Sequence, residues 1–244
     1  MRSILRAIDV LGLFDTQHPT RSLREIVAAT GLPKTTAVRL LGTLESRGLV
    51  VRRGEVTYAP GAALLRWVRL AQSVWEVNAH TREVMRHLVD ECGETVNIYV
   101  RQDLDRVSIA QEEGTATVRS VVEVGAVMPL SRGATAKVLL SGAPDAVVDR
   151  LGAVDPALDT AALRRQVAAV RETGYEVTHG ERELGASAVA APVLAADGRV
   201  LAAVSVSGPT SRFTADRVPR YVDAVTAAAR SISKAGLGSV EAFL

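Results

Sequence analysis

Short hydroxyl side chains surround a single arginine on one side of the segment 34–46. On a helix, with about 100° of turn per residue, this segment separates its aliphatic residues from its polar ones. The aliphatic face comprises Ala37, Val38, Leu41 and Leu44. The polar face comprises Thr35, Thr36, Arg39, Thr43 and Ser46. Short hydroxyls let the backbone approach phosphates, and a central arginine reaches a base edge, so this face favours DNA recognition over an ordinary solvated surface of Glu and Lys pairs. Lys34, at the start of the helix, is included among the expected DNA contacts.

The residues before this helix complete a DNA-binding motif. Ser22 and Glu25 have the spacing of a capping box, which opens a helix over residues 23–29. Gly31 is suited to ending that helix in a left-handed conformation, and Pro33 is suited to the first turn of the next helix. Two short helices joined by a glycine-containing turn predict a helix-turn-helix.

The flanking segments supply a wing and a support. Residues 49–58 contain two β-rich runs around a glycine turn, which predicts a hairpin whose Arg52 and Arg53 contact phosphates. Residues 2–15 predict a first helix that packs under the helix-turn-helix. Its apolar stripe comprises Ile4, Leu5, Ile8 and Leu11.

Composition agrees with this division of the chain. Residues 1–60 hold nine basic and five acidic residues, a net +4, whereas residues 61–244 hold twenty and twenty-two, a net −2. The positive excess therefore coincides with the expected DNA-binding module. The only cysteine, Cys92, excludes an intramolecular disulfide and suits core packing in a reducing cytoplasm. No apolar run is long enough for a transmembrane helix, and the N-terminus lacks the pattern of a signal peptide, so we expect a cytoplasmic protein.

A helical linker follows the wing. Residues 62–92 have a helical pattern almost throughout, and we assign residues 61–78 to a linker helix. This stretch carries both tryptophans of the chain, Trp67 and Trp75. Large aromatic residues on a linker favour a subunit interface, with an intrachain core as the alternative.

Beyond the linker, the pattern predicts an α+β sensor domain over residues 79–235, built around an antiparallel sheet. The expected strands are 95–100, 106–110, 118–124, 175–178, 187–194 and 199–207. The expected helices are 133–140, 144–151, 160–173 and 214–234. Residues 236–244 are expected to form a frayed or exposed tail.

Two features of this second half suit a binding pocket. Ser205 and Ser207 alternate on a strand, so both hydroxyls face one side, where either a ligand or the neighbouring backbone can bind them. The small residues 133–135 begin a helix whose free N–H groups attract anions, and Arg132 precedes it. Asn97 and Tyr99, which alternate on the first sensor strand, either line the same pocket or pack in the core.

Several stretches together resemble one family, the IclR-type transcriptional regulators of bacteria. The first is SLREIVAATGLPKTTAVRLLGTLESRGLV, which is similar to the family's helix-turn-helix. The others are ETVNIYV, MPLSRGATAKVLL, GYEVTHGERELGASAVAAPVL and AAVSVSGP, in that order. The resemblance implies a winged helix-turn-helix (residues 1–60), a GAF/profilin-like sensor domain, and a homodimer or dimer of dimers (a homotetramer) that binds operator DNA.

The resemblance also implies where a small-molecule effector binds. The family's contacts fall on Ala134, Thr135, Ser205 and Ser207, and the start of the same helix adds Gly133 to the expected site. Two more fall on Thr178 and Ala188, where many relatives have an acid and a Cys or Ser, so no particular effector carries over. For Glu181 we expect a structural ion pair or a loop hydrogen bond. The chemistry of the site favours a small carboxylate or amino-acid-type metabolite.

Nothing in the sequence points to an enzyme. His80 and His87 lie seven residues apart on one helix face but have no third ligand near them, and no nucleophile, phosphate-loop or zinc motif is present. We therefore expect no catalytic residue, no metal and no cofactor. The expected partners are double-stranded operator DNA and a small effector, without a membrane.

Overall fold

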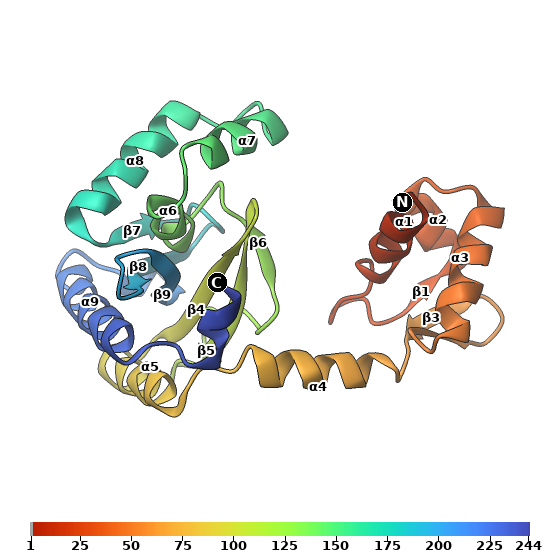
Figure 1. Ribbon diagram of the computed structural model, residues 1–244, viewed down its shortest axis with the longest axis horizontal. Coiled ribbons are helices and arrows are strands. Elements are labelled where there is room, and N and C mark those ends of the chain that lie inside the picture. The colour runs from red at the N-terminus through yellow and green to blue at the C-terminus, as the bar shows by residue number, and fades with distance from the viewer. Residues whose placement is uncertain (1) are drawn as a thin grey trace. The chain divides into compact units, whose positions relative to one another are not determined.

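The computed structural model describes residues 2–244, and the chain divides into two compact units, Met1–Val74 and Trp75–Leu244 (Figure 1). The first unit is a small helical domain with a short three-stranded sheet, and the second is built on a six-stranded antiparallel sheet. The fold is therefore α+β, as the sequence predicts.

The first unit is a winged helix-turn-helix. Its helices are α1 (Arg2–Leu11), α2 (Leu23–Thr30), α3 (Lys34–Ser46) and α4 (Leu64–Val74). Its strands, in sheet order, are β1 (Arg21–Ser22), β3 (Thr57–Pro60) and β2 (Val50–Arg53). The capping box is confirmed: Ser22 Oγ accepts from the Glu25 N–H, and Glu25 Oε2 accepts from the Ser22 N–H at 2.7 Å. Gly31 adopts φ 64°, the left-handed conformation that lets the chain turn from α2 into α3.

Helix α1 packs on the core of the first unit as predicted, but Leu11 is the one member of the predicted stripe that contacts this core. Val10 is fully buried against α2 and α3, whereas Ile4, Leu5 and Ile8 are all more than half exposed. The helix also ends at Leu11 rather than at residue 15. Ala7, Val10 and Leu11 also have helical spacing, and the short domain core contacts this side of the helix.

Residues 62–92 do not form a nearly continuous helix. Helix α4 ends at Val74, and a second helix, α5 (Ala79–Cys92), begins after an extended Asn78. The side-chain Oδ1 of Asn78 accepts from the Thr81 N–H at 2.8 Å and its Nδ2 donates to the Gly236 carbonyl at 2.7 Å. Asn in this conformation is a favourable N-cap, so a new helix begins directly after Asn78.

The C-terminal residues fold back onto the core instead of fraying. Leu237 and Val240 are fully buried, and residues Ser239–Phe243 form a 3₁₀ helix (η2). The Phe243 ring lies 5.9 Å from the Trp75 ring, and Trp75 packs against the core of the second unit. The expectation of an exposed tail is therefore wrong, and Trp75 belongs to an intrachain core, whereas Trp67 on α4 remains half exposed.

The sheet of the second unit is antiparallel throughout, in the order β6-β5-β4-β9-β8-β7. Its strands are β4 (Thr95–Gln102), β5 (Asp105–Glu112), β6 (Val127–Pro129), β7 (Glu176–His179), β8 (Ala186–Leu194) and β9 (Val200–Pro209). The predicted strand at 118–124 is wrong. Val118, Val121 and Val124 are exposed on a loop, and the third strand on that edge is β6.

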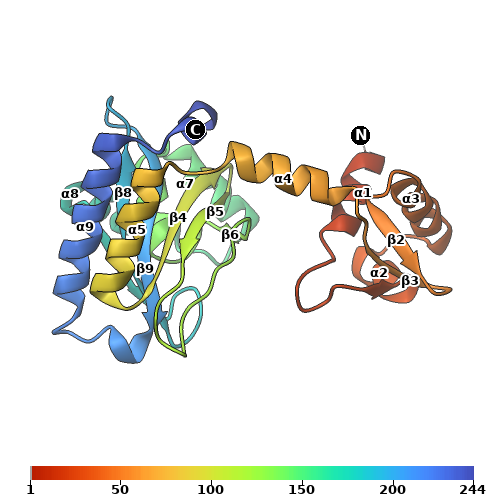
Figure 2. The same ribbon diagram turned by 90° about the horizontal axis from the view of Figure 1, so that it is seen from below.

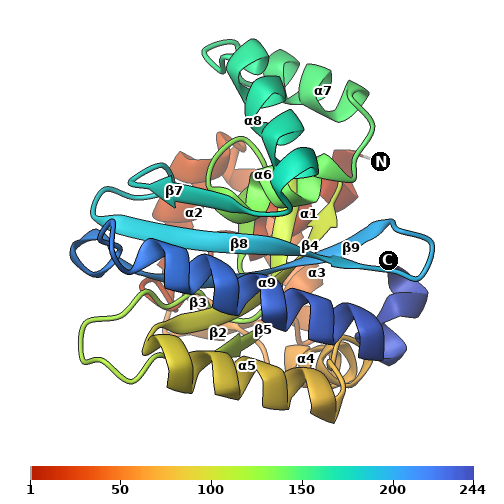
Figure 3. The ribbon, with the colours of Figure 1, turned by 90° about the vertical axis from the view of Figure 1, so that its left-hand side faces the viewer.

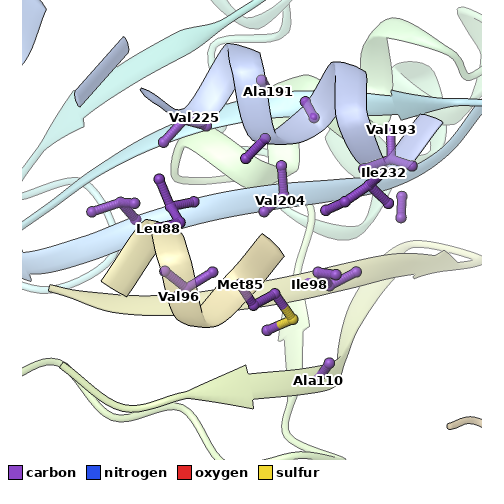
Figure 4. Packing of buried hydrophobic residues seen from close by; sticks show 14 of the residues in the cluster. Met85, Leu88, Val96, Ile98, Ala110, Ala191, Val193, Val204, Val225 and Ile232 are labelled. Carbon is purple, nitrogen blue, oxygen red and sulfur yellow. The ribbon is translucent and has the colours of Figure 1, made fainter. Parts of the chain in front are cut away.

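Helices cover both faces of this sheet (Figures 2 and 3). Helices α5 and α9 (Val218–Ala235) lie side by side on one face, with strand residues such as Val96, Ile98 and Val204 packed under them (Figure 4). The other face carries α6 (Ala134–Ser141), α7 (Ala146–Val154) and α8 (Thr160–Thr173). Cys92 is half-buried at the end of α5, and burial raises the pKa of its thiol to about 12, consistent with a packing role.

Candidate functional site

Helix α3 separates a buried face from an exposed one. Ala37 and Leu41 are fully buried and Leu44 nearly so, because they pack on α2 and the start of the hairpin. Val38 is an exception: it is nearly half exposed, so the predicted buried face is narrower. Lys34, Thr35, Arg39 and Thr43 are exposed and Thr36 is half-buried.

The polar residues of α3 remain available to a partner. The Thr43 hydroxyl donates to the Arg39 carbonyl at 3.0 Å, which leaves its lone pairs outward. Within residues 2–244, neither Lys34 nor Arg39 forms an ion pair. An exposed, unpaired arginine flanked by hydroxyls can bind phosphate or a base edge without first breaking an internal contact.

The hairpin places its two arginines on opposite sides. Arg52 faces Tyr58 and Arg53 faces Thr57 in the β2–β3 register, and adjacent residues of a strand point to opposite faces. Both side chains are exposed, and Arg52 Nη2 donates to the Glu55 carbonyl within the turn. The side chains of Arg52 and Arg53 therefore cannot both contact one phosphate group, and each has to contact a different one.

In the second unit, a small cavity lies between the sheet and the start of α6. It encloses about 30 Å³, room for one or two water molecules. From the sheet it is lined by Tyr99, Thr178, Ala188, Ser205 and Ser207. From the start of α6 it is lined by Gly133, Ala134 and Thr135. The strand register brings Thr178, Ala188 and Ser207 into one row across β7, β8 and β9.

The N-terminus of α6 is only partly open. The Gly133 N–H donates to Glu181 Oε2 at 3.1 Å, and the Ala134 N–H donates to Thr178 Oγ1 at 3.2 Å. The expectation that these N–H groups are free is therefore wrong for the first two. The Thr135 N–H has no hydrogen-bond partner within the described residues 2–244.

A buried ion triad supports this helix. Lys137 is 2% exposed, and its Nζ lies 2.6 Å from Glu181 Oε1 and 3.3 Å from Glu176 Oε1. Glu181 thus forms the structural ion pair that the sequence predicts. Burial raises the pKa of Glu176, and the Lys137 ammonium opposes that shift without overcoming it.

The serines of β9 bring unpaired hydroxyls to the cavity. Ser207 Oγ is buried and has no hydrogen-bond partner among residues 2–244. Its neighbour Ser205 is 2% exposed on the same face of the strand. The backbone alternative therefore fails for Ser207, and a buried hydroxyl without a partner costs about 1–3 kcal/mol.

Two arginines that the sequence did not single out also line the cavity, together with Ala186 and Ser187. Arg106 is 2% exposed and its Nη1 donates to the carbonyls of Pro129 and Arg132, the latter at 2.9 Å. Burial lowers the pKa of Arg106 to about 10. The alternation of Arg106 with Ser108 on a strand was the available signal, because it places a charge on an inward face.

Two predicted residues lie outside the cavity lining. Asn97 is fully buried beside it, but its Nδ2 donates to the Val122 carbonyl at 2.9 Å and to Ser108 Oγ at 3.3 Å. Arg132 is exposed and only its carbonyl contacts Arg106. Asn97 therefore anchors the loop before β6.

In the part of the chain that the structure describes, no group of three His, Cys, Asp or Glu residues is placed to hold a metal ion. His80 bonds to Ser231 Oγ at 3.2 Å, and His87 lies 3.8 Å from Glu83. Across residues 2–244, no helix combines the length and the apolar character that crossing a membrane requires.

Comparison with known proteins adds to this geometry. Residues 3–54 match the family profile described as the IclR helix-turn-helix domain, and residues 70–234 match the bacterial transcriptional regulator IclR C-terminal profile. The HTH-type transcriptional regulator KipR of Bacillus subtilis is 29% identical over 241 residues, covering 96% of each chain. A solved structure from Rhodococcus sp., assigned to the IclR-family regulators, is 47% identical with a TM-score of 0.67 and covers 98% of this chain and 95% of its own. Another from Silicibacter sp. TM1040 is 26% identical with a TM-score of 0.79, covering 96% and 95%.

Proposed function

The chain belongs to the IclR family of bacterial transcriptional regulators, and on that premise we propose that a small carboxylate or amino-acid-type metabolite, bound in the second unit, controls its binding to operator DNA. The relatives are transcriptional regulators rather than enzymes. The observation that carries the proposal is Ser207 Oγ, a buried hydroxyl without a partner in the lining of a cavity. We propose the DNA-binding domain at residues 1–60, the linker at 61–78 and the sensor from residue 79 onward.

The DNA contacts that we propose are the exposed face of α3 and the hairpin. Arg39 reads base edges, while Thr35, Thr36, Thr43 and Lys34 position the helix on phosphates. Arg52 and Arg53 contribute phosphate contacts from the hairpin.

Arg39→Ala tests this assignment. It should weaken binding to the chain's own upstream DNA by about 1–3 kcal/mol and relax sequence preference. Arg165→Ala is the matched control, because Arg165 is an exposed arginine on α8 and its loss changes the net charge equally. Gel shifts against operator and random DNA measure both. Unchanged discrimination by the Arg39 variant would refute the assignment.

The effector site that we propose centres on Ser205, Ser207 and the Thr135 N–H, with Gly133, Ala134, Thr178 and Ala188 shaping the walls. These donors can share the charge of one carboxylate, and the alanines of the lining with the Tyr99 ring accept an apolar tail. Tyr99 lines one side of this site. Asn97 and Arg132 lie outside the cavity lining and support the elements that form it.

The double variant Ser205→Ala with Ser207→Val tests the pocket. It should abolish the thermal shift produced by a bound carboxylate and leave DNA binding by the free protein near normal. Ser108→Ala is the control, because Ser108 is an equally buried serine outside the cavity lining. A double variant that still responds would place the effector elsewhere. The ligand can alter DNA binding only if it prefers one conformational state of the protein.

We also propose that the protein is a homodimer or a dimer of dimers. Helix α4 exposes Leu65, Trp67, Val68 and Leu70, each by about half or more, although monomeric proteins seldom leave such a cluster uncovered. Sedimentation of Trp67→Ala tests this: the assembly should weaken, and an unchanged mass and affinity would contradict it.

A further inference from the structure

One wall of the cavity carries two guanidinium groups and no carboxylate. Arg106 and Arg182 both belong to the lining, and Asp or Glu side chains do not. Glu181, which contacts the start of α6, is already bound to Lys137 and to the Gly133 N–H. Glu183 lies 3.5 Å from Arg182 but is largely exposed. The lining is therefore electropositive.

Arg106 has an unused donor. Its Nη1 is held by two carbonyls, and its guanidinium carbon lies 5.9 Å from the centre of the Tyr99 ring. Its Nε is buried and has no hydrogen-bond partner among residues 2–244. Gly133 lies beside this guanidinium, since a methyl group there would be in ordinary contact with Arg106 Nη2 at 3.5 Å. A buried charge with a free N–H calls for an anionic acceptor.

Arg182 is a movable second donor. Its Nη2 donates to Ser120 Oγ at 3.1 Å, and its ion pair with Glu183 is loose and partly exposed. Such surface contacts contribute little, so a carboxylate in the cavity can recruit this guanidinium. The small volume of the cavity agrees with a closed state in which Arg182 is bound to the loop instead.

The donors therefore form two sets. One consists of the hydroxyls of Ser205 and Ser207 with the Thr135 N–H, and the other consists of Arg106 and Arg182. We propose that the effector is a small dicarboxylate, with one carboxylate on each set. This inference rests on the proposed function, because it assigns the chemical class of the ligand of that pocket. A monocarboxylate leaves Arg106 Nε without an acceptor, and a dicarboxylate satisfies it.

The test compares acids that differ only in the second carboxylate. The full-length protein is titrated calorimetrically with propanoate and succinate, and with butanoate and glutarate. Within at least one pair the diacid should bind about tenfold or more tightly. Arg106→Met should remove that advantage while changing monoacid affinity by about twofold or less. Arg132→Met is the control, because Arg132 is an exposed arginine beside the pocket whose side chain does not line it.

A second variant keeps the test decisive if Arg106→Met does not fold. Arg106 supports two carbonyls, so loss of folding in Arg106→Met leaves the test to Arg182→Met, whose side chain is partly exposed. Equal binding of monoacid and diacid, or equal losses for both in the Arg182 variant, would overturn the dicarboxylate and leave the carboxylate pocket standing. Binding of none of the four acids would overturn both proposals.

Discussion

The two faces of the six-stranded sheet bury different kinds of side chain. Under α5 and α9 the buried strand residues are aliphatic, and side chains such as Val96, Ile98 and Val204 interdigitate with both helices (Figure 4). Under α6 the alternate positions of the same strands carry Thr95, Asn97, Ser205 and Ser207. One face supplies stability through apolar burial, and the other gives up some of that stability to hold polar groups ready for a partner.

The contrast extends to charge. Among the described residues, the α6 side buries Arg106 and Lys137, while the buried acid near the α5 side, Glu94, is neutralised by a bidentate pair with Arg212. Among residues 2–244, the buried side-chain atoms without a hydrogen-bond partner are three that can donate, Arg106 Nε, Gln111 Nε2 and Ser207 Oγ, and one acceptor, Asn97 Oδ1. Buried polar groups without partners are uncommon, and two of these four atoms, Arg106 Nε and Ser207 Oγ, belong to residues that line the cavity.

The largest effect is expected at Lys137, which is paired with Glu176 and Glu181. Lys137→Met should cost about 3–5 kcal/mol of unfolding free energy, because it leaves the largely buried Glu176 and the partly exposed Glu181 facing each other without their shared cation. Urea unfolding measures the loss. Lys234→Met, on the exposed end of α9, is the control and should stay within about 0.5 kcal/mol of the wild type. A loss at position 137 no larger than the control would mean that the triad contributes nothing.

Residues on opposite faces of β9 should respond oppositely. Val204→Ser puts an unpaired hydroxyl and a smaller side chain under α5 and α9, which should cost about 2–4 kcal/mol. Ser207→Ala removes a hydroxyl that already lacks a partner, so it should leave the free protein equally stable or up to about 1 kcal/mol more stable. Thermal or urea unfolding measures both. If the Ser207 variant lost as much stability as the Val204 variant, the two faces of the sheet would not differ in how they contribute to stability.

Local signals in the sequence were sufficient for part of this structure. The capping box at Ser22, the left-handed Gly31 and the hairpin at residues 195–198 depend on a few neighbouring residues, so each is found where it is expected. The inward serines followed from strand alternation alone.

What failed depended on distant partners. The alternating valines of residues 118–124 resemble a strand, but the exposed edge of β5 pairs instead with Val127–Pro129. The buried tail needed knowledge of the site where Leu237 and Val240 dock. Arg106 was missed as a pocket residue because strand alternation could place it on an inward face but could not show which other elements meet it there to form a cavity.

The smallest effect concerns Glu176 on β7, one of the two carboxylates paired with Lys137. Burial outweighs the Lys137 ammonium, so the pKa of this carboxyl lies above its ordinary value of 4.5 in the folded chain. The folded state then binds the proton more tightly than the unfolded state does, and the contribution of Glu176 to stability falls as pH rises through this range. Glu176→Gln mimics the protonated form, so its melting temperature relative to the wild type should increase between about pH 4 and pH 7. A difference that is flat or that declines over this range would show that the Lys137 pair dominates burial, and the α6 layer would then hold its charges at no electrostatic cost.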